Sequence, residues 1–161
     1  MSTLSVWRFS TADAADRAVS TLHELSQQQL ISVRDAATVS WQPDAKKPRT
    51  RQLNDLAGAG ALGGAFWGML FGLLFLVPLL GAAIGAAAGA LAGRFSDVGI
   101  DDDFIKRTRE DITPGTSALF VLTDDAVVDR VREAFAGQRA DLLFTNLSAE
   151  QENRLREAFA E

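Results

Sequence analysis

The sequence predicts an α+β fold, a ferredoxin-like antiparallel sheet with helices, interrupted by a glycine-zipper helical hairpin. Two observations support this prediction. Strand and helix patterns alternate at both polar ends of the chain, and no charged residue occurs between Asp55 and Arg94. We therefore divide the 161 residues into a first half of an α/β domain (1–54), a hairpin insertion (55–94) and a second half with a C-terminal helix (95–161).

The first half follows a strand–helix–strand order. Leu4–Phe9 alternates loosely between apolar and polar residues, as a short strand does. Apolar residues at helical spacing, with Thr11 as the N-cap, predict a helix over Asp13–Leu30. Ile31–Trp41 is expected to form the second strand, and Arg49–Leu53 a short edge strand after a turn that contains two prolines.

The second half repeats this order after a short helix over Asp101–Asp111. Ser117–Thr123 is a continuous apolar run of the kind that a central strand shows. A helical stripe follows, then a strand over Ala140–Leu147 and a closing helix that starts at the capping box of Ser148 and Gln151. Two such halves usually merge into one four-stranded antiparallel sheet with two helices on one face. Neither half has enough apolar surface to be stable alone.

Glycines of the uncharged stretch form two series with a spacing of four residues. Residues four apart share one helix face, so each series makes a groove without side chains, where another helix backbone can approach closely. A helical glycine costs about 1 kcal/mol relative to alanine, and close packing would offset this cost. A hairpin buried in a soluble core is the alternative. The two series are Gly60, Gly64, Gly68 and Gly72, and Gly81, Gly85, Gly89 and Gly93.

The hairpin has the hydropathy of a membrane segment, but its two helices differ in length. Leu56–Val77 would extend about 33 Å, enough to cross a hydrocarbon core of about 30 Å, whereas Leu79–Gly93 would reach about 22 Å. The sequence is compatible with three arrangements: a hairpin that spans the bilayer, a re-entrant hairpin, and packing between subunits. If both halves share one sheet, both hairpin ends lie on one side, which the flanking basic residues place in the cytoplasm. These residues are Lys46, Lys47, Arg49, Arg51 and Arg94.

No residue set marks the chain as an enzyme. The sequence has no cysteine and a single histidine, His23, which excludes thiolate and multi-histidine metal sites. The carboxylates of Asp101–Asp103 are better explained as favourable charge at a helix N-terminus than as a metal site. We therefore predict no cofactor and identify no small-molecule substrate. The net charge of −5 argues against nucleic acid as the main partner.

The chain resembles a known family in the zipper hairpin, in VGIDDDFIKRTREDITPGTSALFVLTDD and in the closing LLFTNLSAEQENRLREAFAE. On these segments it is similar, over essentially its full length, to the bacterial predicted membrane proteins grouped as domain-of-unknown-function family 1269. The resemblance implies membrane association and lends no catalytic residue. It also suggests a structural junction that aligns the hairpin with the sheet. The junction residues are Asp101, Asp102, Asp103, Phe104, Pro114, Gly115, Ser117 and Phe120.

Three functions are compatible with these patterns. The first is a non-enzymatic structural protein of the cell membrane, with both termini cytoplasmic, that homo-oligomerises through the zipper in the lipid bilayer. The second is a cytoplasmic self-assembling protein (a shell, tube or large oligomer) whose hairpins bury one another. The third is a ligand-sensing regulatory domain, for which the fold alone is weak support.

Overall fold

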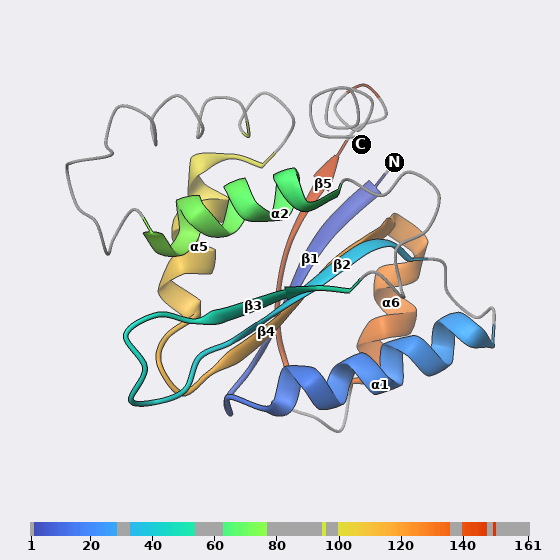
Figure 1. Cartoon of the computed structure of the whole chain (residues 1–161). Helices are drawn as coiled ribbons and strands as arrows, with labels where there is room; N and C mark the ends of the chain where they lie inside the picture. The colour runs from blue at the N-terminus through green and yellow to red at the C-terminus, as the bar shows by residue number, and fades with distance from the viewer. Residues whose placement is uncertain are drawn as a thin grey trace.

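A five-stranded antiparallel sheet organises the part of the chain that the computed structural model describes, which is residues 2–28, 33–53, 63–76, 95, 100–135, 140–147 and 150. Its strands lie in the order β3-β2-β4-β1-β5 (Figure 1). They are β1 (Ser2–Phe9), β2 (Val33–Ser40), β3 (Arg49–Gln52), β4 (Ser117–Asp124) and β5 (Asp141–Leu147). The predicted edge strand is thus present as β3 and raises the strand number from the expected four to five.

The central strand β4 is buried on both of its faces. It pairs with β1 on one side and β2 on the other, so that Phe120 lies opposite Val6 and Ala37. Successive β4 residues alternate between two hydrophobic cores, with Phe120 in one core and Leu119 in the other. This burial explains the continuous apolar run in the sequence and confirms the predicted central strand.

One face of the sheet is covered by α1 (Ala14–Gln27) and α6 (Asp125–Ala134). The first helix buries Ala15, Ala18 and Leu22 against the sheet. Just beyond α6, the ring of Phe135 packs edge-on against Trp7 at 5.4 Å. The predicted N-cap of α1 was wrong: the N-cap is Asp13, and the carbonyl of Thr11 instead accepts a hydrogen bond from Ser117 Oγ at 2.7 Å.

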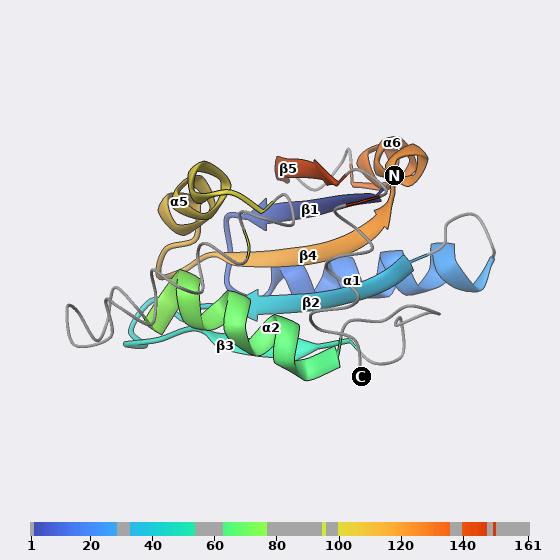
Figure 2. The same cartoon turned by 90° about the horizontal axis from the view of Figure 1, so that it is seen from above.

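The opposite face is covered by α2 (Gly63–Phe71), the π-helix η2 (Gly72–Leu76) and α5 (Asp102–Asp111). Figure 1 shows α2 and α5 on one side of the sheet and α1 and α6 on the other. Two helices, α1 and α6, thus lie on one face as expected, and the uncharged stretch supplies a further helix to the second face. Seen from above, α2 runs along the β3 edge of the sheet (Figure 2).

The large side chains of α2 and η2 belong to the same core as the sheet. Those that are buried there are Phe66, Trp67, Leu70, Phe71, Leu73, Leu74 and Phe75. Within the described residues, no helix combines the length and apolarity needed to cross a membrane. The predicted helix Leu56–Val77 is described only over residues 63–76, and the helix predicted over Leu79–Gly93 lies outside the described residues, as does most of the closing helix.

Candidate functional site

An open groove of about 410 Å³ separates the α2–η2 helix from the β2–β3 hairpin, and we call it the α2–β3 groove. Its hairpin wall is polar and its helix wall is aromatic. The lining residues are Lys47, Pro48, Thr50 and Gln52 from the hairpin and Trp67, Gly68, Phe71, Gly72 and Phe75 from the helix. The groove therefore brings together two glycines of the predicted zipper and one of the predicted basic residues.

The aromatic wall is a ladder of three rings spaced four residues apart. Trp67 and Phe71 stack with centroids 5.7 Å apart, and Phe71 and Phe75 stack at 6.2 Å. Phe120 of β4 supports the ladder from the sheet, edge-on to Phe71 at 5.2 Å. Because these rings are held by the core, the wall has a defined shape before any partner binds.

The glycines lie on the side of α2 that the core does not cover. Gly68 is exposed, and a Cβ atom added there would meet nothing within 4 Å. Gly72 is half-buried and is the first residue of η2, and Gly64 lies in the first turns of α2. The other five zipper residues lie outside the described part of the chain: Gly60, Gly81, Gly85, Gly89 and Gly93.

The indole of Trp67 carries an unused hydrogen-bond donor at the groove wall. Trp67 is only 2% exposed, and its buried Nε1 has no hydrogen-bond partner among the described residues. A buried donor without a partner costs about 1–3 kcal/mol, so this donor is an unusual feature for a purely structural tryptophan. Nothing in the spacing of Trp67 in the sequence indicates an unpaired donor.

The predicted basic residues gather at the hairpin beside the groove. Lys46, Lys47 and Arg49 are exposed and form no ion pair with any described residue, whereas Arg51 lies 3.5 Å from Asp16. Trp41 anchors this hairpin, because its Nε1 donates to the Ala45 carbonyl at 3.1 Å and its ring packs edge-on against Phe75 at 5.9 Å. The remaining basic residue of the prediction, Arg94, lies outside the described residues.

The acidic residues of the predicted structural junction lie at the N-terminus of α5. Asp101 is the N-cap, and its Oδ1 accepts a hydrogen bond from Phe104 N at 2.9 Å. Asp102 and Asp103 are exposed in the first helical turn, and Phe104 is buried in the core beneath α2. Among the three carboxylates it is thus Asp101 that contacts the backbone, which agrees with the structural explanation of this acidic run.

The other end of the predicted junction is the turn that leads into β4. Gly115 has a positive φ of 88°, and its amide donates to the Trp41 carbonyl at 2.7 Å. Pro114 precedes it on the surface. Ser117 Oγ accepts a hydrogen bond from Ala15 N at 2.9 Å and so links β4 to α1. Phe120 lies under the aromatic ladder, so the eight residues occupy several separate contacts rather than one cluster.

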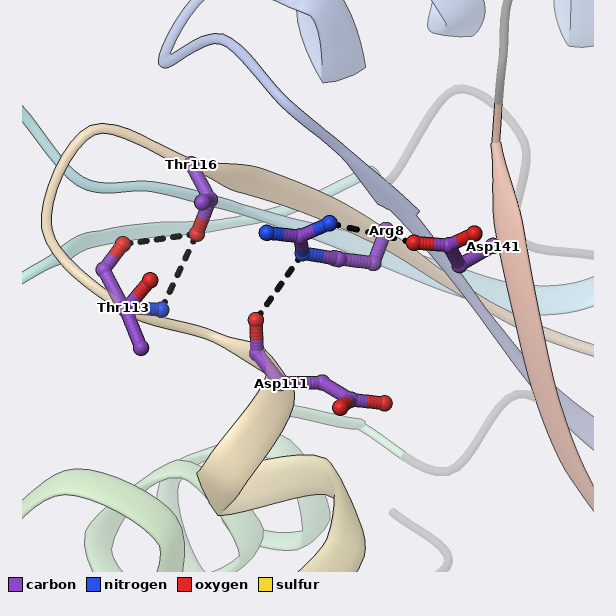
Figure 3. Close-up of polar contacts among 5 residues, drawn as sticks. All are labelled: Arg8, Asp111, Thr113, Thr116 and Asp141. Atoms are coloured by element: carbon purple, nitrogen blue, oxygen red, sulfur yellow. Dashed lines mark hydrogen bonds and ion pairs between the residues drawn. The ribbon is translucent and has the colours of Figure 1, made fainter.

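Arg8 joins this region to the far edge of the sheet, a contact that the sequence did not predict (Figure 3). Its Nε donates to the Asp111 carbonyl at 3.0 Å, and its Nη1 lies 3.0 Å from Asp141 Oδ2. In the same loop, Thr116 Oγ1 donates to the Thr113 carbonyl at 2.6 Å and accepts from Thr113 N at 3.0 Å. These bonds fix the loop between α5 and β4.

Another residue outside the predicted set links the uncharged stretch to α5. Arg109 donates from Nη2 to the Leu73 carbonyl at 2.6 Å and from Nε to the Leu74 carbonyl at 3.2 Å. Because Leu73 and Leu74 lie in η2, Arg109 bonds a polar helix directly to the apolar one. Nothing in the residues around Arg109 indicates that it faces an uncharged helix. The sequence therefore does not predict the contact between Arg109 and η2.

The described residues contain no group of three or more His, Cys, Asp or Glu that could hold a metal ion. His23 contacts Gln27 one turn along α1, with a distance of 2.9 Å between His23 Nε2 and Gln27 Nε2. The α2–β3 groove presents apolar rings and a cation, and we take it as the candidate binding site.

The comparisons with known proteins place the chain in a family. A family model described as a protein of unknown function, DUF1269, matches residues 61–160. The match begins at the uncharged stretch, so it covers less than the full length over which the resemblance was expected. No curated protein matches the chain, and no solved structure matches it. Because the family model covers more than half of the sequence, the chain belongs to the DUF1269 family of proteins of unknown function.

Proposed function

We propose that this protein is a non-enzymatic structural protein that associates with further copies of itself through the glycine-bearing side of α2. One observation carries the proposal: the exposed side of this helix has no charge and almost no side chains. Gly68 is open to solvent, and beside it Met69 is 37% exposed, the large hydrophobic residue that the described part of the chain leaves most open. The whole stretch between Asp55 and Arg94 adds no charge.

A second α2 helix is the partner that fits this side best. Small residues four apart let two helix backbones approach closely, and such packing offsets the helical cost of glycine, about 1 kcal/mol per residue. The large side chains of α2 already pack on the sheet, so they are not available to a partner. The small residues and Met69 are what remain for contact.

The fold supports the same proposal. We infer a ferredoxin-like arrangement, because the order β2-β4-β1-β5 is the one that two βαβ halves produce, with β3 added at the edge. In that arrangement one sheet face normally stays open. Here α2 covers it and presents its own glycine side outward, which makes the helix an added layer suited to assembly.

Membrane attachment is the second candidate, with the hairpin of residues 55–94 in the cell membrane and both termini in the cytoplasm. The observation that favours it is the exposed group of Lys46, Lys47 and Arg49, which have no ion pairs among the described residues and lie beside the uncharged helix. Each such cation near an anionic bilayer contributes about 1 kcal/mol of attraction.

Sizing of the full-length protein, first without and then with detergent, tests both candidates. Self-association predicts an oligomer in detergent-free buffer that Met69→Arg dissociates, because a charge would be buried in the interface. Ser20→Arg, on the exposed side of α1, is the matched control and should leave the oligomer intact. A detergent-free protein that stays monomeric at every concentration would overturn the proposal. Retention on carbonate-washed membranes, with release only in detergent, would favour the second candidate.

A further inference from the structure

We propose that the α2–β3 groove binds an anionic amphiphile, a molecule with one apolar chain and a carboxylate or phosphate head. The groove shares Gly68 and Gly72 with the glycine-bearing side of α2, but Met69 does not line it, so a change at Met69 distinguishes ligand binding from self-association. The groove volume of about 410 Å³ lies within the range of small-molecule sites, about 300–1,000 Å³. The chemistry of its two walls selects the class of ligand.

The helix wall suits an apolar chain. Trp67, Phe71 and Phe75 form a continuous aromatic ladder along the groove. Gly68 and Gly72 alternate with these rings and project no side chain, so the narrow ring surface that lines the groove, 2–7% of each residue, is left uncovered. An extended chain laid over the two glycines would bury apolar surface without displacing any side chain.

The hairpin wall suits an anionic head. Lys47 lines the groove together with Thr50 and Gln52, and none of the described lining residues is acidic. Lys46 and Arg49 lie next to Lys47 in the chain and, like it, form no ion pair with any described residue. The hairpin has two acids, Asp35 in β2 and Asp44 in the turn, and neither is among the described lining residues, so the charge at this wall attracts anions.

Trp67 supplies a second polar anchor at the groove. Its Nε1 donor is buried and pairs with no residue in the described part of the chain, and Trp67 itself lines the groove. An oxygen of a bound head group would accept this hydrogen bond and remove the penalty of the unpaired donor. A cationic amphiphile has no acceptor to offer there and would be repelled by Lys47. Lys47 and the Trp67 donor are the two groups among the lining residues that would bind an oxyanion.

Titration calorimetry of the full-length protein tests this assignment, using dodecanoate and dodecyl phosphate below their critical micelle concentrations. Both should bind saturably at one site per chain. Dodecyltrimethylammonium, with the same chain and the opposite charge, should bind at least about tenfold more weakly. If the cationic amphiphile binds as tightly as the anions, or if binding occurs only to anionic vesicles and never to monomeric amphiphile, the assignment is wrong.

Variants locate the site. Lys47→Glu and Gly68→Leu should each weaken dodecanoate binding by at least about tenfold, the first by charge and the second by filling the space beside the rings. Lys106→Glu, an equal charge change on exposed α5, is the control. Trp67→Phe should weaken binding without lowering the stability of the free protein, which a structural role of the indole donor would not produce. Unchanged binding in Lys47→Glu would overturn the proposal.

The same measurements separate this proposal from self-association. Met69→Arg should dissociate the oligomer and leave dodecanoate binding unchanged, because Met69 lies outside the groove. Lys47→Glu should weaken dodecanoate binding and leave the oligomer intact. A protein that is monomeric yet binds dodecanoate through Lys47 would contradict the assembly proposal alone, and an oligomer that binds no amphiphile would contradict the groove proposal alone.

Discussion

Arg109 of α5 donates a hydrogen bond from its guanidinium to the backbone carbonyl of Leu73 in η2, with 2.6 Å between Nη2 and the oxygen. The sequence contains a reason for this contact. Residue 78 would supply the helical N–H for the Leu74 carbonyl in an α-helical turn, or for the Leu73 carbonyl in a π-helical turn, and residue 78 is a proline without an N–H. Arg109 provides donors to both carbonyls in its place.

Replacing Arg109 should therefore destabilise the packing of α5 on η2. We expect Arg109→Met to lower the free energy of unfolding by about 1.5–3 kcal/mol, the range for hydrogen bonds from a charged group. Urea denaturation followed by circular dichroism measures this change. Arg107→Met, two residues earlier and exposed, should shift stability by no more than about 0.5 kcal/mol. Equal losses in the two variants would show that the carbonyl contacts contribute nothing.

Two glycine-to-alanine substitutions should change stability in opposite directions. At Gly115 the nearest atom to an added Cβ is Pro43 Cγ at 3.7 Å, so space is sufficient, but φ is 88°. Gly115→Ala should thus cost about 1–2 kcal/mol through backbone strain alone. At Gly68 the added Cβ meets open space in a helix, so Gly68→Ala should stabilise the monomer by up to about 1 kcal/mol. Thermal unfolding of both variants tests the prediction. A rise in Tm for Gly115→Ala, or a fall for Gly68→Ala, would contradict it.

The helix cap of α5 should depend on one carboxylate of the acidic run. Asp101→Ala should cost about 1 kcal/mol because it removes the acceptor for Phe104 N. The family resemblance suggested a structural junction that includes Asp102 and Asp103, whose replacement would then loosen the fold or the assembly. Since both are exposed and contribute only helix-end charge, we now expect about 0.3–1 kcal/mol for each of these two. Chemical denaturation at low and high salt separates the hydrogen bond of Asp101 from the helix-end charge of Asp102 and Asp103, because only the stabilisation by charge weakens with salt.

The segment that matches the family should not fold when it is isolated. Within residues 61–161, β4 and β5 have no common edge, because β1 lies between them and pairs with both. A fragment of residues 61–161 should lack cooperative thermal unfolding, and adding a 1–60 fragment should restore it. Amide NMR spectra provide the measurement. A well-dispersed spectrum from the 61–161 fragment alone would show that it pairs its strands differently.

Several elements could be predicted from the sequence because the information for them is local. The alternation in Leu4–Phe9, the apolar run in Ser117–Thr123 and the short helix over Asp101–Asp111 depend on neighbours within a few residues, and the structure has β1, β4 and α5 at these places. The edge strand was also predicted, since prolines and charged residues are typical of an edge. The candidate groove could not be predicted from the sequence, because its helix wall and its hairpin wall come from segments that are distant in sequence.

The sequence by itself determined that this protein alternates strands and helices around an uncharged, glycine-rich stretch, since periodicity and composition depend on nearby residues. Only the tertiary structure decided what that stretch does with its apolar side chains. Phe66, Trp67 and Phe71 would be equally favourable in lipid, in a neighbouring subunit or on a sheet, because burial of apolar surface has no direction. Long-range packing against β4 and β1 selects the sheet, and this choice turns Gly68 outward and places it beside Lys47.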